Sequence, residues 1–354
     1  MADTKQINLA LQGGGAHGAF GWGVLDRLAE DARLDIEGIS GTSAGSVNAV
    51  VYAHGRMLGG RDGARAALEG FWRKVSESGR TYSPLGATPW AEGRSMNFNP
   101  AYILFDTMTR ALSPHQFNPF DLNPLRDVLD ACVDFEMLSG CREVELFISA
   151  TNVRTGQIRV FRNHDVSLDS VMASACLPQL FRAVDVGGEA YWDGGFMGNP
   201  ALFPLFYHTK SRDVVIVHIN PIERVGVPAT APEIQDRVNE ITFNSSLLRE
   251  LRVVAFVTRL IEQGWLKDEY VGRMKHVLMH AIRADEAMSG LPVASKLNTD
   301  WGFLTRLRDL GRAAADAWLA QSFEHLGERS TVDLARDYLD ADVFGSPPPG
   351  VDKS

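Results

Sequence analysis

The feature that most constrains this fold is a serine between two glycines at the end of a predicted strand. Residues 34–40 are expected to form the strand, and the run Gly41-x-Ser43-x-Gly45 follows it directly. Valines at helical spacing predict a helix over residues 44–54. A serine on such a strand-to-helix turn projects its hydroxyl from the chain, and the glycines allow backbone and helix to approach closely. The same run also fits an ordinary turn in which the serine caps the helix.

A second glycine-rich loop follows the first predicted strand. That strand is expected over residues 7–11, and it leads through Gly13-Gly14-Gly15 into a helix over residues 19–29. Strand, loop, helix, strand, turn and helix in this order are typical of a parallel sheet with crossover helices. Both loops then lie at the carboxyl ends of strands, where open α/β sheets place their sites.

The triple glycine permits two interpretations. Consecutive N–H groups can converge on an anion, and together with Ser43 they would form an oxyanion hole for acyl transfer. The spacing Gly13-x-Gly15-x-x-Gly18 also matches a dinucleotide-binding loop. A dinucleotide site needs an acidic residue at the end of the second strand, where this sequence has its serine turn. We therefore favour acyl transfer.

A serine nucleophile needs a base, and Asp193 is the best candidate. No histidine lies in the sequence context of an α/β-hydrolase base, and His218 falls in a predicted buried strand as an expected core residue. A predicted hairpin precedes Asp193, and Gly194 and Gly195 follow it. A carboxylate within hydrogen-bond distance of the Ser43 hydroxyl could act as the base of a dyad. On its own, the Asp-Gly-Gly run is more typical of an Asx turn.

The composition disfavours several classes of protein. A net charge of −9 argues against a general nucleic-acid-binding protein. Three cysteines without C-x-x-C spacing support neither a disulfide scaffold nor a structural zinc site. The sequence contains no signal segment and no apolar run of membrane-spanning length, so we expect a soluble, cytoplasmic protein.

Four segments occur in an order that is specific although each is weak alone. They are G-G-G-A-H-G at 13–18, G-T-S-A-G at 41–45, A-S-A-C-L-P-Q-L-F at 173–181 and D-G-G at 193–195, with Asn199-Pro200 after them. Together they resemble the patatin-like phospholipases over roughly residues 6–225. The resemblance implies a three-layer α/β/α patatin-like fold with a mostly parallel central sheet.

The resemblance also implies a chemistry: a phospholipase A or lysophospholipase that cleaves carboxylic esters of lipids or phospholipids without metal or cofactor. Ser43 would be the nucleophile and Asp193 the general base and acid. The oxyanion hole would consist of Gly13, Gly14, Gly15 and Ala44. The supporting residues would be His17, Gly41, Gly45, Gly194 and Gly195. The expected partners are a lipid or other acyl-ester substrate and, transiently, a membrane surface.

One residue departs from the family pattern. The family's glycine loop usually carries Arg or Lys where His17 stands. A cation there would help to hold the loop or to stabilise the oxyanion, whereas a histidine with an ordinary pKa near 6.5 is only partly charged at neutral pH. The alternative, which we favour, is that His17 only orders the loop at the start of its helix.

The same machinery would serve other acyl esters. An intracellular polyester depolymerase and a thioesterase are therefore alternatives, because only the shape of the pocket would distinguish them. A catalytically inert lipid-binding scaffold is a third alternative. The intact Ser43, Asp193 and glycine loop argue against it.

The chain divides into a catalytic core, an extension and a tail. Residues 1–225 are predicted to form the α/β core, residues 226–343 a helical extension packed on it, and residues 344–354 a disordered tail. The Pro- and Phe-rich stretch 98–120 fits a lid, the wall of an acyl groove or core packing. An apolar stripe over residues 247–260 fits an interfacial helix or, more commonly, a core-packed one.

Overall fold

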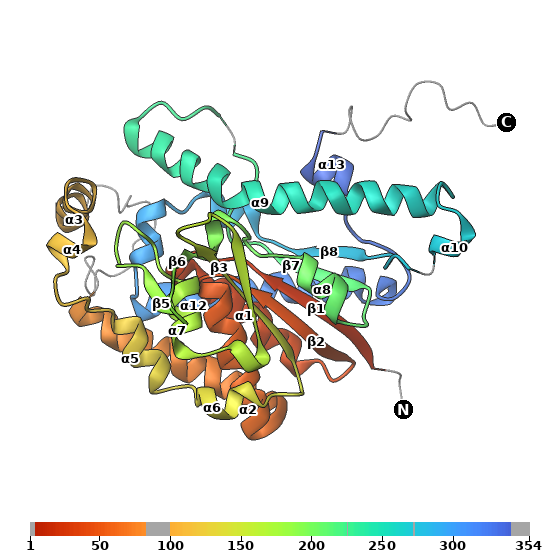
Figure 1. Cartoon of the computed structure of the whole chain (residues 1–354), viewed down its shortest axis with the longest axis horizontal. Helices are drawn as coiled ribbons and strands as arrows, with labels where there is room; N and C mark the ends of the chain where they lie inside the picture. Colours follow the sequence, from red (N-terminus) through yellow and green to blue (C-terminus); the bar gives the residue numbers. More distant parts are fainter. Residues whose placement is uncertain (1–3, 83–99, 225, 272, 341–354) are drawn as a thin grey trace.

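One mixed β-sheet forms the centre of the molecule (Figure 1). A computed structural model describes residues 4–82, 100–224, 226–271 and 273–340. The strand order is β5-β6-β3-β2-β1-β7-β8, and β4 pairs with β3. The strands are β1 (Lys5–Leu11), β2 (Leu34–Gly41), β3 (Glu145–Asn152), β4 (Ile158–Arg162), β5 (Val184–Val186), β6 (Glu189–Asp193), β7 (Asp213–Val217) and β8 (Leu278–Ile282).

The sheet is parallel from β3 through β2, β1 and β7 to β8, and antiparallel where β4, β5 and β6 join it. After Asp213, strand β7 consists only of buried apolar residues, because both faces of this parallel strand are covered. In β7, Val215 and Val217 belong to one hydrophobic core, and Val214 and Ile216 belong to the other. The three-layer α/β/α fold predicted from the sequence is confirmed.

Helices cover both faces of the sheet. Helices α1, α2 and α12 contribute to the first core, and α8, α9 and α13 contribute to the second. The α-helices are α1 (Gly18–Glu30), α2 (Ala44–Tyr82), α3 (Pro100–Ala111), α4 (Pro114–Phe117), α5 (Pro124–Asp130), α6 (Phe135–Ser139), α7 (Leu168–Ser174), α8 (Phe203–His208), α9 (Ala231–Glu262), α10 (Asp268–Val271), α11 (Asp285–Ser289), α12 (Trp301–Ser322) and α13 (Leu334–Tyr338). Short 3₁₀ turns η1 (Gly15–His17), η4 (Gly194–Phe196) and η5 (Val293–Leu297) adjoin the site described below.

The C-terminal region differs in one respect from the predicted helical extension. Strand β8 lies within it and pairs in parallel with β7, so this region contributes to the sheet itself. The reason is that a buried strand of five residues is a short apolar run, whose periodicity does not distinguish it from a turn of buried helix. The predicted tail, 344–354, lies outside the described residues.

The two segments for which the sequence allowed several interpretations lie in different environments. Leu247 and Leu251 on α9 are fully buried, so the apolar stripe of this helix is core-packed. In the stretch 98–120, of which residues 98 and 99 lie outside the described part, Leu104 is 63% exposed and Phe120 is 83% exposed. Core packing does not account for these two side chains, and a lid or groove wall stays a prediction. In the described residues, none of the helices is long and apolar enough to cross a bilayer.

Candidate active site

Strand register brings the serine turn and Asp193 to the same place. Strand β2 pairs with β3 up to Gly41, which lies opposite Ile148, and Asp193 lies opposite Ala150. Strand β4 occupies the other side of β3 at both positions, so β2 and β6 lie in line along one side of β3. Asp193 is therefore about 7 Å along β3 from the end of β2, beside the turn that carries Ser43.

The Ser43 turn is a strained elbow. Ser43 has a φ of 54°, in the left-handed region that non-glycine residues rarely adopt. A serine that caps a helix has extended dihedrals, so Ser43 is not an ordinary cap. Its N–H donates to the Ser174 hydroxyl at 3.0 Å, and α2 begins at Ala44. The turn is tight enough that a Cβ at Gly45 would collide with the Leu11 carbonyl oxygen.

The two carboxylate oxygens of Asp193 have different environments. Oδ1 accepts a hydrogen bond from the Gly195 N–H at 2.7 Å, while Oδ2, also buried, makes none with the described residues. Burial raises the pKa of Asp193 to about 6, against the opposing effects of the Gly195 N–H, the Ser43 side chain and the Lys296 charge. The Asp-Gly-Gly run thus forms the Asx-type contact with one oxygen and leaves the other oxygen available.

The glycine loop lies against the serine turn. A Cβ at Gly13 would be 2.6 Å from the Ser43 Cβ, so no larger residue fits there. The Gly13 N–H donates to Asn199 Oδ1 at 2.7 Å and is therefore not available to an oxyanion, unlike the expectation from the sequence. No acceptor in the described part of the chain pairs with the N–H of Gly14, Gly15 or Ala44.

The remaining supporting glycines are also sterically required. A Cβ at Gly41 would be 2.6 Å from the Gly45 carbonyl oxygen. At Gly194 it would collide with the Ser149 carbonyl oxygen, and at Gly195 with the ring of Phe243 on α9. These close approaches account for Gly41 and Gly45 of the G-x-S-x-G run and for Gly194 and Gly195 of the D-G-G run.

Buried amide side chains anchor the loops, and the sequence motifs did not identify most of them. Gln12 Oε1 accepts from the backbone N–H groups of Ile219 and Asn220 at 2.8 and 2.9 Å, and its Nε2 donates to Asn244 Oδ1 at 3.0 Å. Asn220 Nδ2 donates to the Gly13 carbonyl at 2.8 Å. A signal was present, because Asn220 follows the carboxyl end of β7, where α/β sheets place their functional groups.

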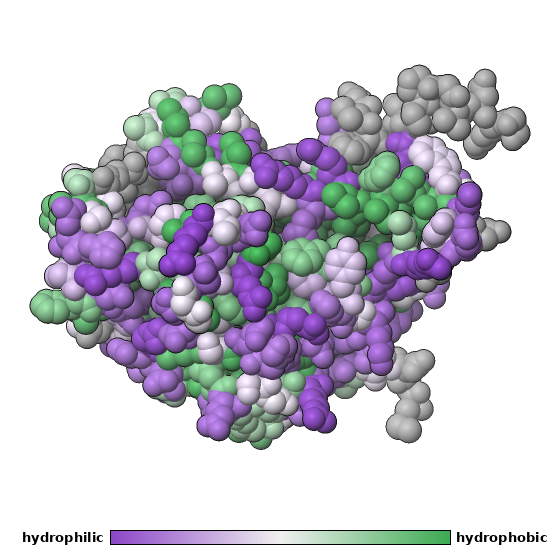
Figure 2. Space-filling view, in the orientation of Figure 1, coloured by the Kyte–Doolittle hydropathy of each residue, from purple (hydrophilic) through white to green (hydrophobic). Residues whose placement is uncertain are grey.

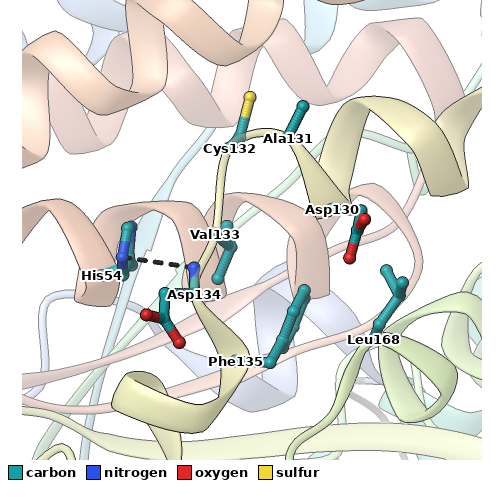
Figure 3. A pocket seen from close by; sticks show the side chains of 8 residues that line it. All are labelled: His54, Asp130, Ala131, Cys132, Val133, Asp134, Phe135 and Leu168. Atoms are coloured by element: carbon teal, nitrogen blue, oxygen red, sulfur yellow. Dashed lines mark hydrogen bonds between the residues drawn. The ribbon is translucent and has the colours of Figure 1, made fainter.

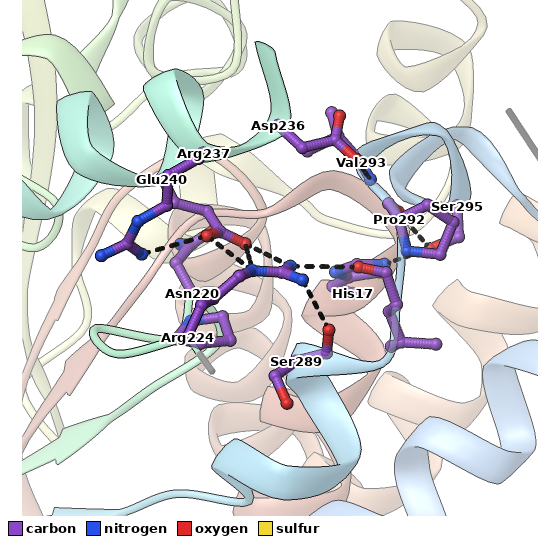
Figure 4. A network of polar contacts seen from close by, with 12 residues as sticks. His17, Asn220, Arg224, Asp236, Arg237, Glu240, Ser289, Pro292, Val293 and Ser295 are labelled. Atoms are coloured by element: carbon purple, nitrogen blue, oxygen red, sulfur yellow. Dashed lines mark hydrogen bonds and ion pairs between the residues drawn. The ribbon is translucent and has the colours of Figure 1, made fainter. Parts of the chain in front are cut away.

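His17 is neutral in this environment. Burial, followed by the charges of Lys296 and Arg224, lowers its pKa well below the usual value. Its Nε2 lies 2.7 Å from the Ser295 hydroxyl (Figure 4). Its ring also meets the ring of Phe303 edge to face. These contacts agree with the interpretation that His17 orders the loop.

A surface hollow of about 510 Å³ lies elsewhere on the molecule (Figure 3). Residues of α2, the α5–α6 connection and α7 line it, and His54 Nε2 there accepts from the Asp134 N–H at 3.3 Å. None of the predicted site residues lines this hollow. Within the described ranges, no group of three or more His, Cys, Asp and Glu side chains could hold a metal ion.

Comparison with known proteins places this site in a family. The family model described as patatin-like phospholipase matches residues 9–206, which include both loops and Asp193. No curated protein matches the sequence significantly.

Solved structures give distant likenesses. VipD from Legionella pneumophila is 15% identical, with 86% of this chain and 67% of that chain covered and a TM-score of 0.33. ExoU in its heterodimeric complex with SpcU from Pseudomonas aeruginosa is 17% identical, with 91% and 76% covered and a TM-score of 0.33. Full-length ExoU with SpcU is 14% identical, with 89% of this chain but 53% of that chain covered and a TM-score of 0.31. This chain thus spans about half of the full-length ExoU chain, and we draw no argument from these likenesses.

Proposed function

The chain belongs to the patatin-like phospholipase family, and we propose that it is a serine lipid acyl hydrolase with a Ser43–Asp193 dyad. One observation carries the proposal. The carboxyl of Asp193 is fully buried beside the serine turn, and the Ser43 side chain is close enough to it to lower its pKa, although no hydrogen bond of good geometry reaches Oδ2 from the described residues. A buried acceptor that is left unpaired costs folding free energy, and such groups concentrate at functional sites.

In this mechanism Asp193 is the base. With a pKa of about 6 it is ionised at neutral pH, and the Gly195 N–H holds Oδ1 so that Oδ2 is left for the serine proton. Ser43 Oγ bonds to the ester carbonyl carbon as its proton passes to Oδ2. The left-handed φ of Ser43 holds the nucleophile at the tip of the turn.

The oxyanion of the tetrahedral intermediate would be held by the N–H groups of Gly14, Gly15 and Ala44. The positive end of α2, which begins at Ala44, adds to this stabilisation. Gly13 has an anchoring role instead, through Asn199 and Asn220. When the ester C–O bond breaks, Asp193 returns its proton to the leaving alcohol, and water hydrolyses the acyl-enzyme by the same steps.

The proposed substrate is a phospholipid or lysophospholipid ester, approached from a lipid surface. Phe243 packs on Gly195, and its ring centroid lies 5.8 Å from that of Phe196, so α9 packs against the turn that follows Asp193. Less than two turns earlier on the same helix, Val238 and Ile241 are exposed. Figure 2 shows apolar surface over this part of α9, and we propose that it contacts lipid transiently.

The test is hydrolysis of p-nitrophenyl esters of increasing chain length and of phospholipid vesicles. We expect Ser43→Ala and Asp193→Asn each to lower kcat by about 10³-fold or more. Ser139→Ala, at the end of α6, is the matched control and should leave kcat unchanged. A Ser43→Ala variant that retains most of the activity would contradict the dyad. A preference for thioesters or polyesters would leave the proposed dyad standing and would change the proposed substrate class.

A further inference from the structure

A lysine from outside the matched region lies against the glycine loop. Lys296 belongs to η5, and a Cβ at Gly15 would be 2.5 Å from its carbonyl oxygen. Its Nζ donates to Asn220 Oδ1 at 2.8 Å, and Asn220 Nδ2 donates to the Gly13 carbonyl at 2.8 Å. Lys296 therefore contacts the loop twice, once through its backbone and once through an amide that binds Gly13.

The ammonium of Lys296 also lies near the dyad. The residue is half-buried, and its Nζ makes a part-buried hydrogen bond to Asn220. Nζ is 5.7 Å from the centroid of the Phe243 ring, and the same ring packs on Gly195. The interaction is reciprocal, because the charge of Lys296 lowers the pKa of Asp193 and the charge of Asp193 raises that of Lys296.

The other charges near Lys296 are largely matched among themselves. Glu240 on α9 pairs with Arg224 at 2.5 Å and with Arg237 at 3.2 Å (Figure 4). Burial, as the largest effect, lowers the pKa of Lys296 to about 8. The titratable or charged groups that face it are Glu240 and Asp236 on α9, Asp193 at the end of β6, Arg224 after β7 and neutral His17 on η1.

We propose that Lys296 is the positioning residue of the oxyanion loop and supplies a positive charge beside it. It would fix Gly13 to Gly15 through Asn220 and through its own backbone. Its charge would favour the negative charge that develops at the loop and would keep Asp193 ionised. This inference rests on the proposed Ser43–Asp193 chemistry.

The pH profile of kcat/KM separates this role from a purely structural one. Wild-type activity should fall below about pH 6 as Asp193 takes up a proton, and above about pH 8 as Lys296 loses one. In Lys296→Met the alkaline decline should disappear, since no ammonium remains to titrate. Its acidic limb should move to higher pH, because the charge that lowers the Asp193 pKa is gone.

The size of the effect distinguishes charge from hydrogen bonding. Lys296→Met should lower kcat by about 10- to 100-fold with little change in KM, less than direct loss of an oxyanion donor. Lys296→Gln keeps a donor for Asn220 without the charge, and it should lower kcat nearly as much. Lys296→Arg should restore most of kcat and keep it above pH 8, because a guanidinium does not titrate there.

Lys275→Met is the matched control. Lys275 is also half-buried with a lowered pKa, and its Nζ donates to the Leu205 and Thr209 carbonyls at 3.1 and 2.8 Å. These partners lie at α8, away from the glycine loop, so the control should keep the wild-type kcat and pH profile. Thermal unfolding of each variant checks that it folds; if Lys296→Met does not, Lys296→Gln and Lys296→Arg carry the comparison.

The outcomes distinguish the two proposals. An active wild type whose folded Lys296→Met and Lys296→Gln variants keep the wild-type kcat and alkaline limb would overturn the role of Lys296 and leave the dyad standing. A wild type that hydrolyses no ester and does not react with a fluorophosphonate at Ser43 would overturn the proposed function, and this inference with it.

Discussion

Two buried aspartates near opposite ends of the parallel strands have different surroundings. Asp213, at the start of β7, accepts from His280 Nε2 at 2.9 Å and from the Gly327 N–H at 2.9 and 3.0 Å, so both of its oxygens are used. Asp193, at the end of β6, uses Oδ1 only, and no described residue donates a hydrogen bond to Oδ2.

We interpret this difference as the one between a structural carboxylate, Asp213, and the proposed catalytic one, Asp193. The contacts of Asp213 join β7 to β8 and to the loop after α12, and His280 is itself held by the Thr331 hydroxyl at 2.8 Å. At the carboxyl ends of β2 and β3, the unpaired oxygen of Asp193 and the left-handed backbone of Ser43 both cost folding free energy. The fold holds these two residues in place through the close-packed glycines around them and through the hydrogen bonds of the Ser43 N–H to Ser174 and of the Gly195 N–H to Asp193.

The largest predicted effect is on activity. Asp193→Asn should lower kcat by about 10³-fold or more, because an amide cannot take the proton of Ser43. Asp213→Asn should leave kcat within about threefold, measured below its unfolding transition, because Asp213 lies at the start of β7, at the opposite end of the parallel strands from Ser43. Equal losses in the two variants would erase the distinction between the aspartates.

The next effect is on stability, and it falls on Asp213 and not on Asp193. Asp213→Ala should lower the free energy of unfolding by about 3–5 kcal/mol, because it leaves the buried His280 and the Gly327 N–H without their acceptor. Urea denaturation measures this change. The control is Asp309→Ala, whose side chain is 62% exposed beside Arg308 and should matter by about 1 kcal/mol or less. A comparable change in both would mean that Asp213 is not structural.

A third effect depends on pH. The folded-state pKa of Asp193 is about 6, above its unfolded value near 3.8, so the native state binds more protons between these values. The free energy of unfolding of the wild type, relative to that of Asp193→Asn, should therefore fall as the pH rises from about 4 to 6. The total decrease should be up to about 3 kcal/mol, and the difference should stay level above pH 6. Melting temperatures of both proteins from pH 4 to 8 test this, and a constant difference would refute it.

The smallest effect concerns Ser43. Ser43→Gly should stabilise the protein by about 1 kcal/mol, since glycine adopts a φ of 54° without strain. Ser43→Ala keeps the Cβ and should bring no such gain. If both variants have the stability of the wild type, the elbow is not strained.

Local motifs in the sequence predicted the parts of the site that lie within one turn or loop. Gly45 and Gly194 follow from close backbone contacts, and the G-x-S-x-G and D-G-G runs therefore identified both loops. The two oxygens of Asp193 could not be assigned from the motif, because the D-G-G run on its own is more typical of an Asx turn.

Contacts between distant segments could not be predicted. Whether the Gly13 N–H is free depends on Asn199, and the charge state of His17 depends on burial under residues near 295–303. Strand β8 has no periodicity that marks it, and Lys296 has no motif around it. These features depend on how the C-terminal region packs on the core, which no single segment encodes.

The central claim is that Ser43 reacts with Asp193 as its base, and intact-protein mass spectrometry of fluorophosphonate labelling tests it most directly. We predict one adduct per chain on Ser43, a labelling rate that falls below about pH 6, and very slow labelling of Asp193→Asn at every pH. Stoichiometric labelling of a Ser43→Ala variant, or a rate in Asp193→Asn equal to that of the wild type, would contradict the account.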